Sequence, residues 1–318
     1  MTSFSDMVFS QGVPLAGHGI PATFGTTYFV DADNGSDGNS GLKMNEAKAT
    51  VLAAYNLTTS GAHDVIVMSA NGGHTFADEL VVSKSRVHFV GLGMGTRYMG
   101  QRTRWTMGVT TGSAISLLKV TGVGCTFTNI KMSSADTLST SLYCVADGGE
   151  FTQFTNCWFE KSTDLDQTGA AELLCNADTG YYKGCAIGNS IYAVSVARQN
   201  VLFTRETISG KVARDVIFED CLFQIKTSAT TPVNCRATAN DIERLCLFRK
   251  CIFWSAKTSS ATQALVWGVA SALTDAQVLL DRCTVQNITN VGANTIGVYT
   301  NSPTPVAAAT ESVAVHTS

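Results

Sequence analysis

The fold of this chain is decided by six related segments, which read VGCTFTNIKMSS (123–134), FTNCWFEKST (154–163), YKGCAIGNS (182–190), FEDCLFQIKTS (218–228), FRKCIFWSAKTS (248–259) and LDRCTVQNITN (280–290). Each segment has a few aromatic or aliphatic residues, a polar pair, a cysteine and an alternating tail. The cysteines follow one another at steps of 32, 28, 36, 30 and 32 residues and are Cys125, Cys157, Cys185, Cys221, Cys251 and Cys283. A period in this range is typical of a repeat architecture.

Two weaker series complete each period. One consists of short runs between the main cysteines, at 141–149, 171–180, 232–240, 264–272 and 294–302. The other consists of apolar runs just before the main cysteines, as at 215–218 and 277–280. Each period therefore holds about three short strands separated by polar turns.

The residue pattern selects among the repeat folds. The runs alternate with a period of two and favour Val, Ile, Phe, Thr and Cys, which excludes the amphipathic helices of ankyrin, tetratricopeptide and HEAT repeats. Propeller blades would need about four strands in about 40–50 residues. We therefore predict an all-β fold, a right-handed parallel β-helix with three short strands per coil. Its coils would stack at ~4.8 Å, with side chains at matching positions forming ladders.

The ten cysteines are interpreted as packing residues. Cysteine is small, apolar and readily buried, so it suits a ladder position. The sequence has no CxxC pair and no Cys/His cluster at zinc spacing. A secreted disulfide scaffold is the alternative interpretation, but the periodic placement favours reduced, buried thiols in a chain made in a cytoplasm.

Composition narrows the classes of partner. Charged residues make up 15% of the chain, against ~25% in typical soluble domains, which suggests that much of the surface faces other subunits. The net charge is −3 and the basic residues are scattered, so we expect no nucleic-acid partner. No apolar run approaches the length of a membrane span, and no basic region precedes a hydrophobic core at the N-terminus, so we expect neither a membrane span nor a signal peptide.

The chain divides into a solenoid and two ends. Residues 1–24 have two prolines, three glycines and no clear period, and we predict an extended arm, with a disordered leader as the alternative. We predict that residues 25–301 form the β-helix. Within them, 45–57 (NEAKATVLAAYNL) predict a helix with Asn45 as its N-cap, which would cover the open end of the solenoid. Residues 302–318 predict a tail, flexible alone or borrowed as a strand by a neighbour.

The turn-rich stretch 31–41 (DADNGSDGNSG) has the composition of a calcium loop. An EF-hand requires glycine at its sixth position and glutamate at its twelfth, and those places hold Ser36 and Leu42. A chain of Asx turns is the better interpretation. The glycines of 91–95 have the wrong spacing for a dinucleotide site, and no long helix follows them.

Two irregular stretches are candidates for contacts with partners. Residues 91–108 mix cations and aromatics, namely Arg97, Tyr98, Arg102, Arg104 and Trp105, and would form either a sugar or protein contact or a solvated loop. Residues 197–214 are predicted to be an insertion that explains the 36-residue step, and loops that interrupt a solenoid often make contacts.

The region that follows the N-terminal arm resembles a known family. It reads YFVD (28–31), GSDG (35–38), a short helix, HDVIVMSANGG (63–73) and VHFVGLG (87–93). This order resembles the opening of pectate-lyase-like right-handed β-helix proteins, in particular the version found in tailed-bacteriophage tailspikes and other virion proteins. The resemblance covers roughly residues 26–290. It implies the fold and says little about function, because one fold hosts many sites.

The resemblance includes pectate lyases and endoglycosidase tailspikes, so catalysis must be weighed. Glycoside hydrolysis needs two carboxylates facing one groove. The richest group of candidate carboxylates lies on the predicted turns of the coil after Cys157 and comprises Glu160, Asp164, Asp166, Glu172 and Asp178. Alignment of CVAD (144–147) with CNAD (175–178) makes Asp147 and Asp178 the nearest approach to a stacked pair, although Thr238 holds that place after Cys235.

The alternative is that these carboxylates are solvated turn residues. We find no carboxylate cluster with a nearby arginine of the kind that the resemblance to pectate lyases would imply. The five histidines, His18, His63, His74, His88 and His316, lie in unrelated segments and form no triad-like arrangement. We therefore expect no enzyme activity, no catalytic or metal-binding residues and no cofactor.

The favoured hypothesis is a structural virion protein of a tailed bacteriophage, assembled in the host cytoplasm. It would be a homotrimer that decorates or cements the capsid, anchored on the major capsid protein or another virion protein through residues 1–24. The first alternative is a tail-associated spike or fibre component that binds a host glycan. A polysaccharide-degrading tailspike is the second.

Overall fold

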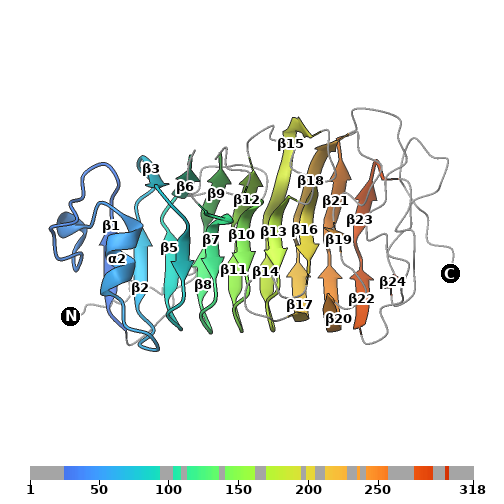
Figure 1. Cartoon of the computed structure of the whole chain (residues 1–318), viewed down its shortest axis with the longest axis horizontal. Helices are drawn as coiled ribbons and strands as arrows, with labels where there is room; N and C mark the ends of the chain where they lie inside the picture. Colours follow the sequence, from blue (N-terminus) through green and yellow to red (C-terminus); the bar gives the residue numbers. More distant parts are fainter. Residues whose placement is uncertain are drawn as a thin grey trace, which may run out of the picture.

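The protein is an all-β solenoid. The computed structural model describes residues 25–93, 103–108, 113–135, 140–161, 170–194, 198–204, 212–227, 235–236, 241–256, 276–288 and 298–300. The described strands form three parallel sheets that run side by side along the long axis (Figure 1). The predicted parallel β-helix with three strands per coil is confirmed. The predicted arm (1–24) and tail (302–318) lie outside the described residues.

From β2 to β19, each coil contributes one strand to each sheet in turn. Sheet 1 contains β1 (Thr27–Val30), β2 (Val65–Met68), β5 (His88–Gly91), β8 (Thr126–Thr128), β11 (Gln153–Thr155), β14 (Tyr181–Lys183), β17 (Ala213–Glu219), β20 (Ile242–Arg249), β22 (Ala276–Asp281) and β24 (Val298–Thr300). Sheet 2 contains β3 (Gly73–Phe76), β6 (Thr103–Met107), β9 (Ile130–Ser134), β12 (Trp158–Lys161), β15 (Ala186–Val194), β18 (Leu222–Thr227), β21 (Ile252–Ser255) and β23 (Thr284–Gln286). Sheet 3 contains β4 (Leu80–Val82), β7 (Ser116–Val120), β10 (Tyr143–Asp147), β13 (Ala171–Cys175), β16 (Gln199–Phe203) and β19 (Cys235–Arg236).

An aromatic ladder runs through the lumen along sheet 1. Its rings are Phe89, Phe127, Phe154, Tyr182, Phe218 and Phe248, and consecutive centroids are 4.6 to 5.3 Å apart with planes within 12° of parallel. Each ring is fully buried. Because the strands are in register, one aromatic position per coil produces a continuous stack, and each such contact adds about 0.5–1.5 kcal/mol beyond area burial.

A tight bend joins sheet 1 to sheet 2 in every regular coil. Its first residue has a left-handed backbone with φ between 52° and 62°, at Asn129, Asn156, Gly184, Asp220, Lys250 and Arg282. From Asn129 to Lys250, the amide of this residue donates to the next coil, as from Asn156 to the Lys183 carbonyl oxygen at 2.8 Å. Asn, Asp and Gly tolerate this backbone best, which explains much of the polar pair before each cysteine.

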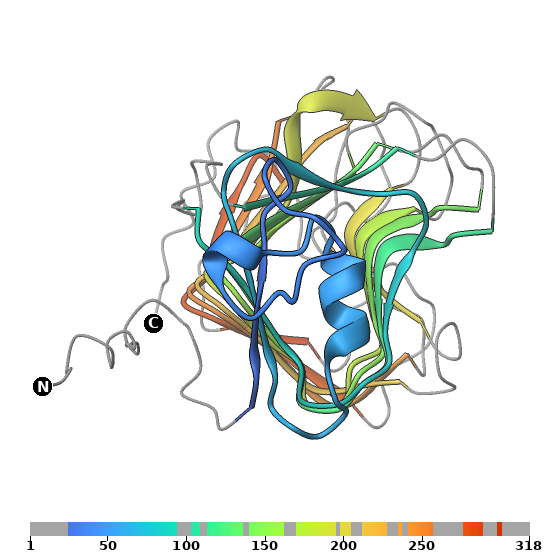
Figure 2. The ribbon, with the colours of Figure 1, turned by 90° about the vertical axis from the view of Figure 1, so that its left-hand side faces the viewer.

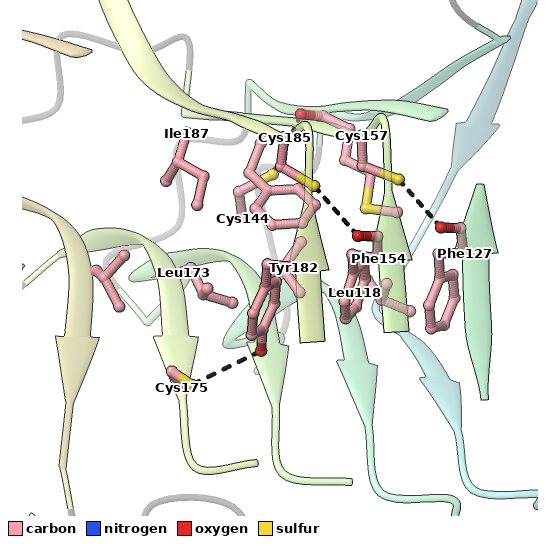
Figure 3. Close-up of a cluster of buried hydrophobic side chains, with 14 of the residues drawn as sticks. Leu118, Phe127, Cys144, Phe154, Cys157, Leu173, Cys175, Tyr182, Cys185 and Ile187 are labelled. Atoms are coloured by element: carbon pink, nitrogen blue, oxygen red, sulfur yellow. Dashed lines mark hydrogen bonds between the residues drawn. The ribbon is translucent and has the colours of Figure 1, made fainter. Parts of the chain in front are cut away.

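The residue after the bend forms the cysteine ladder. Cys157, Cys185, Cys221, Cys251 and Cys283 each donate from Sγ to the carbonyl oxygen of the aromatic residue one coil earlier, at 3.3 to 3.5 Å. Figure 3 shows this for two successive coils. The placement of Cys125 in this ladder was wrong. Cys125 precedes β8, and Ile130 follows the bend at Asn129 instead.

The N-terminal end is covered by a helix that is shorter than predicted. Helix α2 spans Val51–Leu57, and the side chain of Thr50, not Asn45, caps it by accepting from the Ala53 amide at 3.1 Å. The residues before it form a 3-10 turn, η1 (Met44–Glu46), and Ala47 is extended. The sequence lacked a break signal, but Asp37 accepts hydrogen bonds from the amides of Ala49 and Thr50 and holds this segment out of the helix.

Helix α2 is fastened to the solenoid by two side chains. The ring of Tyr55 lies on Phe89 at 6.2 Å and so extends the aromatic ladder, and its hydroxyl accepts from the amides of Ser83 and Lys84. The Lys84 ammonium donates to the carbonyl oxygens of Tyr55, Asn56 and Thr58 at the C-terminal end of α2. A cation is favourable there because the last carbonyls of a helix lack partners within it. The predicted capping role is consistent with this placement.

The turn-rich stretch 31–41 does contain Asx turns. The Asp31 carboxylate accepts from the amides of Asp33 and Asn34 at 3.1 and 3.3 Å. The hydrogen bonds from nearby groups lower the pKa of Asp31, although its slight burial opposes them.

Three sequence interpretations of irregular segments were wrong. Within 91–108, residues Thr103–Met107 form β6, and Trp105 is a fully buried core residue because strand alternation turns it into the lumen. Within 197–214, Gln199–Phe203 form β16, which pairs in register with β13, so these five residues are part of the coil. The run at 294–302 supplies β24 to sheet 1 rather than continuing the series of sheet 3. Arg97, Tyr98 and Arg102 lie outside the described residues.

Two glycines, Gly184 between β14 and β15 and Gly188 within β15, should differ in how well they tolerate a side chain. Gly184 occupies the bend with nothing within 4 Å of an added Cβ, and asparagine holds the same place at Asn156. At Gly188 an added Cβ would lie 2.0 Å from the Gln224 carbonyl oxygen. We expect Gly184→Asn to change the free energy of unfolding by less than about 1 kcal/mol, and Gly188→Ala to lower it by more than about 2 kcal/mol. Urea unfolding of both variants tests this, and comparable losses would contradict the assigned register.

Candidate functional site

Asp147, at the end of β10, is buried in the lumen. Its carboxylate accepts hydrogen bonds from the Tyr182 hydroxyl at 2.6 Å, the Thr152 hydroxyl at 2.7 Å and the Gly149 amide at 3.1 Å. Burial raises its pKa to about 6, although these hydrogen bonds oppose the shift. Tyr182 also contacts the Cys175 sulfur at 3.6 Å (Figure 3). The carboxylate therefore ties the aromatic ladder to sheet 3.

Asp178 does not stack on Asp147, so the predicted pair was wrong. The register pairs Asp147 with Cys175, three residues away from the alignment of CVAD with CNAD. Asp178 instead pairs with Glu150 and Arg214 in isolated bridges and forms a 2.9 Å ion pair with Arg214, which also binds Glu243 at 2.7 Å. The alignment failed because a cysteine occurs at two different register positions of sheet 3.

Glu160, on β12, points outward from sheet 2 but is almost completely buried. Lys131 pairs with it at 2.6 Å, and the Asn189 amide donates to its other oxygen. The Lys131 ammonium also lies 3.9 Å from the centroid of the Trp158 ring. One cation thus bridges a carboxylate and an aromatic face.

Glu172, on β13, forms a buried ion pair with Arg198, each side chain being 2% exposed. The guanidinium also donates to the Lys161 carbonyl oxygen at 2.7 Å. Burial raises the pKa of Glu172, and the Arg198 charge opposes that shift. Asp164 and Asp166 lie outside the described residues.

The four described carboxylates are therefore engaged by four different sets of partners. One faces the lumen and the others lie at separate places on the coil, whereas hydrolysis requires two carboxylates across one groove. Within the described part of the chain, no three His, Cys, Asp or Glu side chains converge to hold a metal ion. In the same residues, no helix is long and apolar enough to cross a membrane.

The ten cysteines lie in packing positions. All ten are free and buried. Burial raises the pKa of Cys125 to about 11 and the pKa values of Cys144 and Cys175 to about 12. The thiolate is the nucleophile, so these three positions suit packing rather than chemistry.

Two histidines that are far apart in the sequence meet at the first coils. His63 Nδ1 lies 3.1 Å from His88 Nε2, and the other nitrogen of His88 lies 2.9 Å from the Thr126 hydroxyl. Burial, together with His63, lowers the pKa of His88 to about 4. Only one proton fits between the facing nitrogens. The sequence alone did not predict this contact, because it depends on the coil that places His88 beside Val65 and the residues that precede β2.

The outer face of sheet 2 combines cationic, acidic, amide and aromatic side chains. Strand alternation places two rows on it, one with Arg104, Lys131 and Trp158 and the other with Glu160, Gln224 and Trp254. Trp158 Nε1 and Gln224 Nε2 both donate to the Gly188 carbonyl oxygen, at 3.0 and 3.2 Å. The sequence does contain a signal for this face that was not used. The first and third residues after a ladder cysteine point outward from sheet 2, as Trp158 and Glu160 do after Cys157.

The raised pKa of Asp147 predicts how the stability of the protein changes with pH. The native carboxyl holds its proton up to about pH 6, whereas the unfolded one loses it near pH 4. Stability from this group is therefore present below pH 4 and is lost as the pH rises through 6. We expect the wild type to lose about 2–3 kcal/mol relative to Asp147→Asn between pH 4 and pH 7.

Urea unfolding at several pH values measures this difference. Asp178→Asn is the matched control, because it removes a carboxylate from a partly exposed ion pair. Equal pH slopes for the wild type and Asp147→Asn would contradict the lumenal placement.

Comparisons with known proteins identify the fold. No family model and no curated protein matches this chain. Among solved structures, pectate lyase Pel9A superposes with a TM-score of 0.56 at 13% identity, over 81% of this chain and 62% of the lyase. Pectin methylesterase from carrot superposes with a TM-score of 0.44 at 12% identity, over 88% of this chain and 90% of the esterase. ORF18 of Geobacillus virus E2 superposes with a TM-score of 0.41 at 11% identity, over 87% of this chain and 60% of that protein.

The chain thus spans about three fifths of the length of the pectate lyase that it matches. At such low identity the likeness concerns the fold and not the activity. The chain adopts the parallel β-helix fold of pectate-lyase-like proteins.

Proposed function

We propose that this protein is a structural component of a tailed-bacteriophage virion and not a glycan-cleaving enzyme. The observation that carries the proposal is that each of the four described candidate carboxylates is bound to its own structural partners. Asp147 holds the lumen together, and Asp178, Glu160 and Glu172 neutralise cations at separate places. These groups stabilise a rigid body, and removal of a partner from a buried pair costs several kcal/mol.

The virion role is supported by the sequence. The opening of the β-helix resembles virion proteins of this fold, and the low content of charged residues suits a surface that faces other subunits. In the proposed arrangement a homotrimer decorates or cements the capsid. Residues 1–24 anchor it to the major capsid protein or another virion protein, after assembly in the host cytoplasm.

Location on the particle tests this proposal. Immunogold labelling of the phage that carries the protein should mark the head in many copies, and light scattering of the purified protein should give the mass of a trimer. Label confined to the tail baseplate would contradict decoration. Cleavage of host-surface polysaccharide by the wild type, abolished in a folded Asp178→Asn variant, would overturn the non-enzymatic assignment.

A tail-associated spike that binds a host glycan is the second candidate, and the outer face of sheet 2 favours it. Trp158 and Trp254 are partly exposed and lie on strands three coils apart, which is about 14 Å at ~4.8 Å per coil. Indole rings offer apolar faces, and Arg104, Lys131 and Gln224 supply hydrogen-bond donors beside them. A linear polysaccharide lying along the solenoid axis would meet these groups in sequence.

A substitution separates the two candidates. In the glycan-binding case, Trp254→Ala should weaken binding to host-surface polysaccharide at least about fivefold, since a stacked aromatic contact is worth about 1 kcal/mol or more. Phe151→Ala is the control, because Phe151 is 60% exposed and lies before β11 on another side of the coil. Isothermal titration measures both. Equal affinities would exclude this face as the glycan site.

A further inference from the structure

The N-terminal end of the solenoid carries a pocket of about 500 Å³ beside the capping helix. On one side it is lined by the start of α2 and the residues before it, including Ala49, Val51 and Leu52. On the other side it is lined by the continuous run 73–80, which comprises β3 and the connection to β4. Figure 2 looks onto this end and shows α2 crossing one side of it. A pocket of this size falls in the range of ligand sites.

The pocket adjoins an unpaired strand edge. Among the described strands, β3 is the last strand of sheet 2 and pairs only with β6, while sheet 1 continues by one more strand, β1, beyond β2 of the same coil. An edge strand presents a row of unpaired N–H and C=O groups, which is a template for another extended chain. The short helix α2 seals the aromatic ladder but leaves this edge beside the pocket.

The pocket walls combine apolar and acidic groups. Val51, Phe76 and Leu80 are buried, and Leu52 is 52% exposed at the rim. Asp78 and Glu79 are the charged residues of the lining, which contains no lysine or arginine. Glu79 is held in place because one carboxylate oxygen accepts from the Ile115 and Ser116 amides and the Ser116 hydroxyl.

A buried histidine adds an unused acceptor. His74 lines the pocket and is 3% exposed, and its Nε2 lies 3.2 Å from the Ser69 carbonyl oxygen. A carbonyl accepts only, so Nε2 carries the proton and Nδ1 is an acceptor, which has no hydrogen-bond partner. Burial lowers the pKa of His74, in keeping with a neutral ring. An unpaired buried acceptor costs about 1–3 kcal/mol, which a donor entering the pocket would recover.

We propose that this pocket docks an extended peptide segment of a partner protein by strand addition to β3. The segment would pair its main chain with Gly73–Phe76, place a branched apolar side chain against Leu52 and Phe76, and set a lysine or arginine beside Asp78 and Glu79. Main-chain pairing gives affinity and alternate side-chain pockets give specificity in this mode. Residues 1–24 of the chain contain no lysine or arginine, so charge complementarity favours a different protein as the donor.

Three synthetic peptides test the site on the full-length protein. The probe is acetyl-Thr-Val-Lys-Val-Thr-Val-amide, the second peptide has glutamate in place of lysine, and the third has N-methylated valines that cannot donate. Hydrogen exchange of the segment 73–80 reports strand addition. We expect the lysine peptide to protect this segment at millimolar concentration, and the other two to bind at least about tenfold more weakly.

Two variants on one helix locate the contact. Leu52→Lys should weaken binding of the lysine peptide at least about tenfold, because it removes the apolar wall of the pocket and adds a charge of the same sign as the peptide's lysine. Leu57→Lys is the matched control, since Leu57 is 41% exposed on α2 but does not line the pocket, and it should leave binding unchanged. Equal loss in both variants, or no protection by any peptide, would overturn the proposal. Binding of a peptide of residues 1–24 that competes with the probe would assign the pocket to the protein's own arm and also overturn it.

Discussion

The left-handed bend between sheets 1 and 2 is the constraint on which the rest of the structure depends. Each bend turns the chain within one residue, and from Asn129 to Lys250 it passes its amide hydrogen bond to the next coil. It thereby fixes where the next strand starts, and a shift of one residue would turn every lumenal side chain outward. The aromatic and cysteine ladders follow from this register, because they place one ring and one thiol per coil at fixed distances from the bend.

The residues that look most chemical hold this scaffold together. Ten cysteines and a set of acidic residues would suggest redox, metal or hydrolytic chemistry if they were read singly. The thiols are buried and seven of them donate to backbone carbonyls, while Asp147 accepts three hydrogen bonds inside the lumen. Buried polar groups are tolerated only when they are paired. Function on this fold is therefore expected at the ends and the outer faces, which is where both the glycan and the peptide proposals lie.

Most of the fold could be predicted from the sequence, because the repeat and its alternation are visible without contacts. The exact register could not. Cys125 was assigned to the ladder that Ile130 occupies, since cysteine also fits a second lumenal position, and the same ambiguity produced the false pairing of Asp147 with Asp178. The start of α2 depended on Asp37, a residue outside the helix. The His63–His88 contact and the pocket beside β3 depend on which coils are neighbours, which a local pattern does not contain.

Thiol accessibility tests the central claim most directly, namely that the cysteines are packing residues of a reduced solenoid. The native protein, treated with an excess of a thiol reagent and analysed by intact mass, should show no rapid labelling, because all ten cysteines are free and buried. After denaturation without a reducing agent, all ten should be labelled. Rapid labelling of the native protein, or fewer than ten labelled thiols after denaturation, would contradict this account.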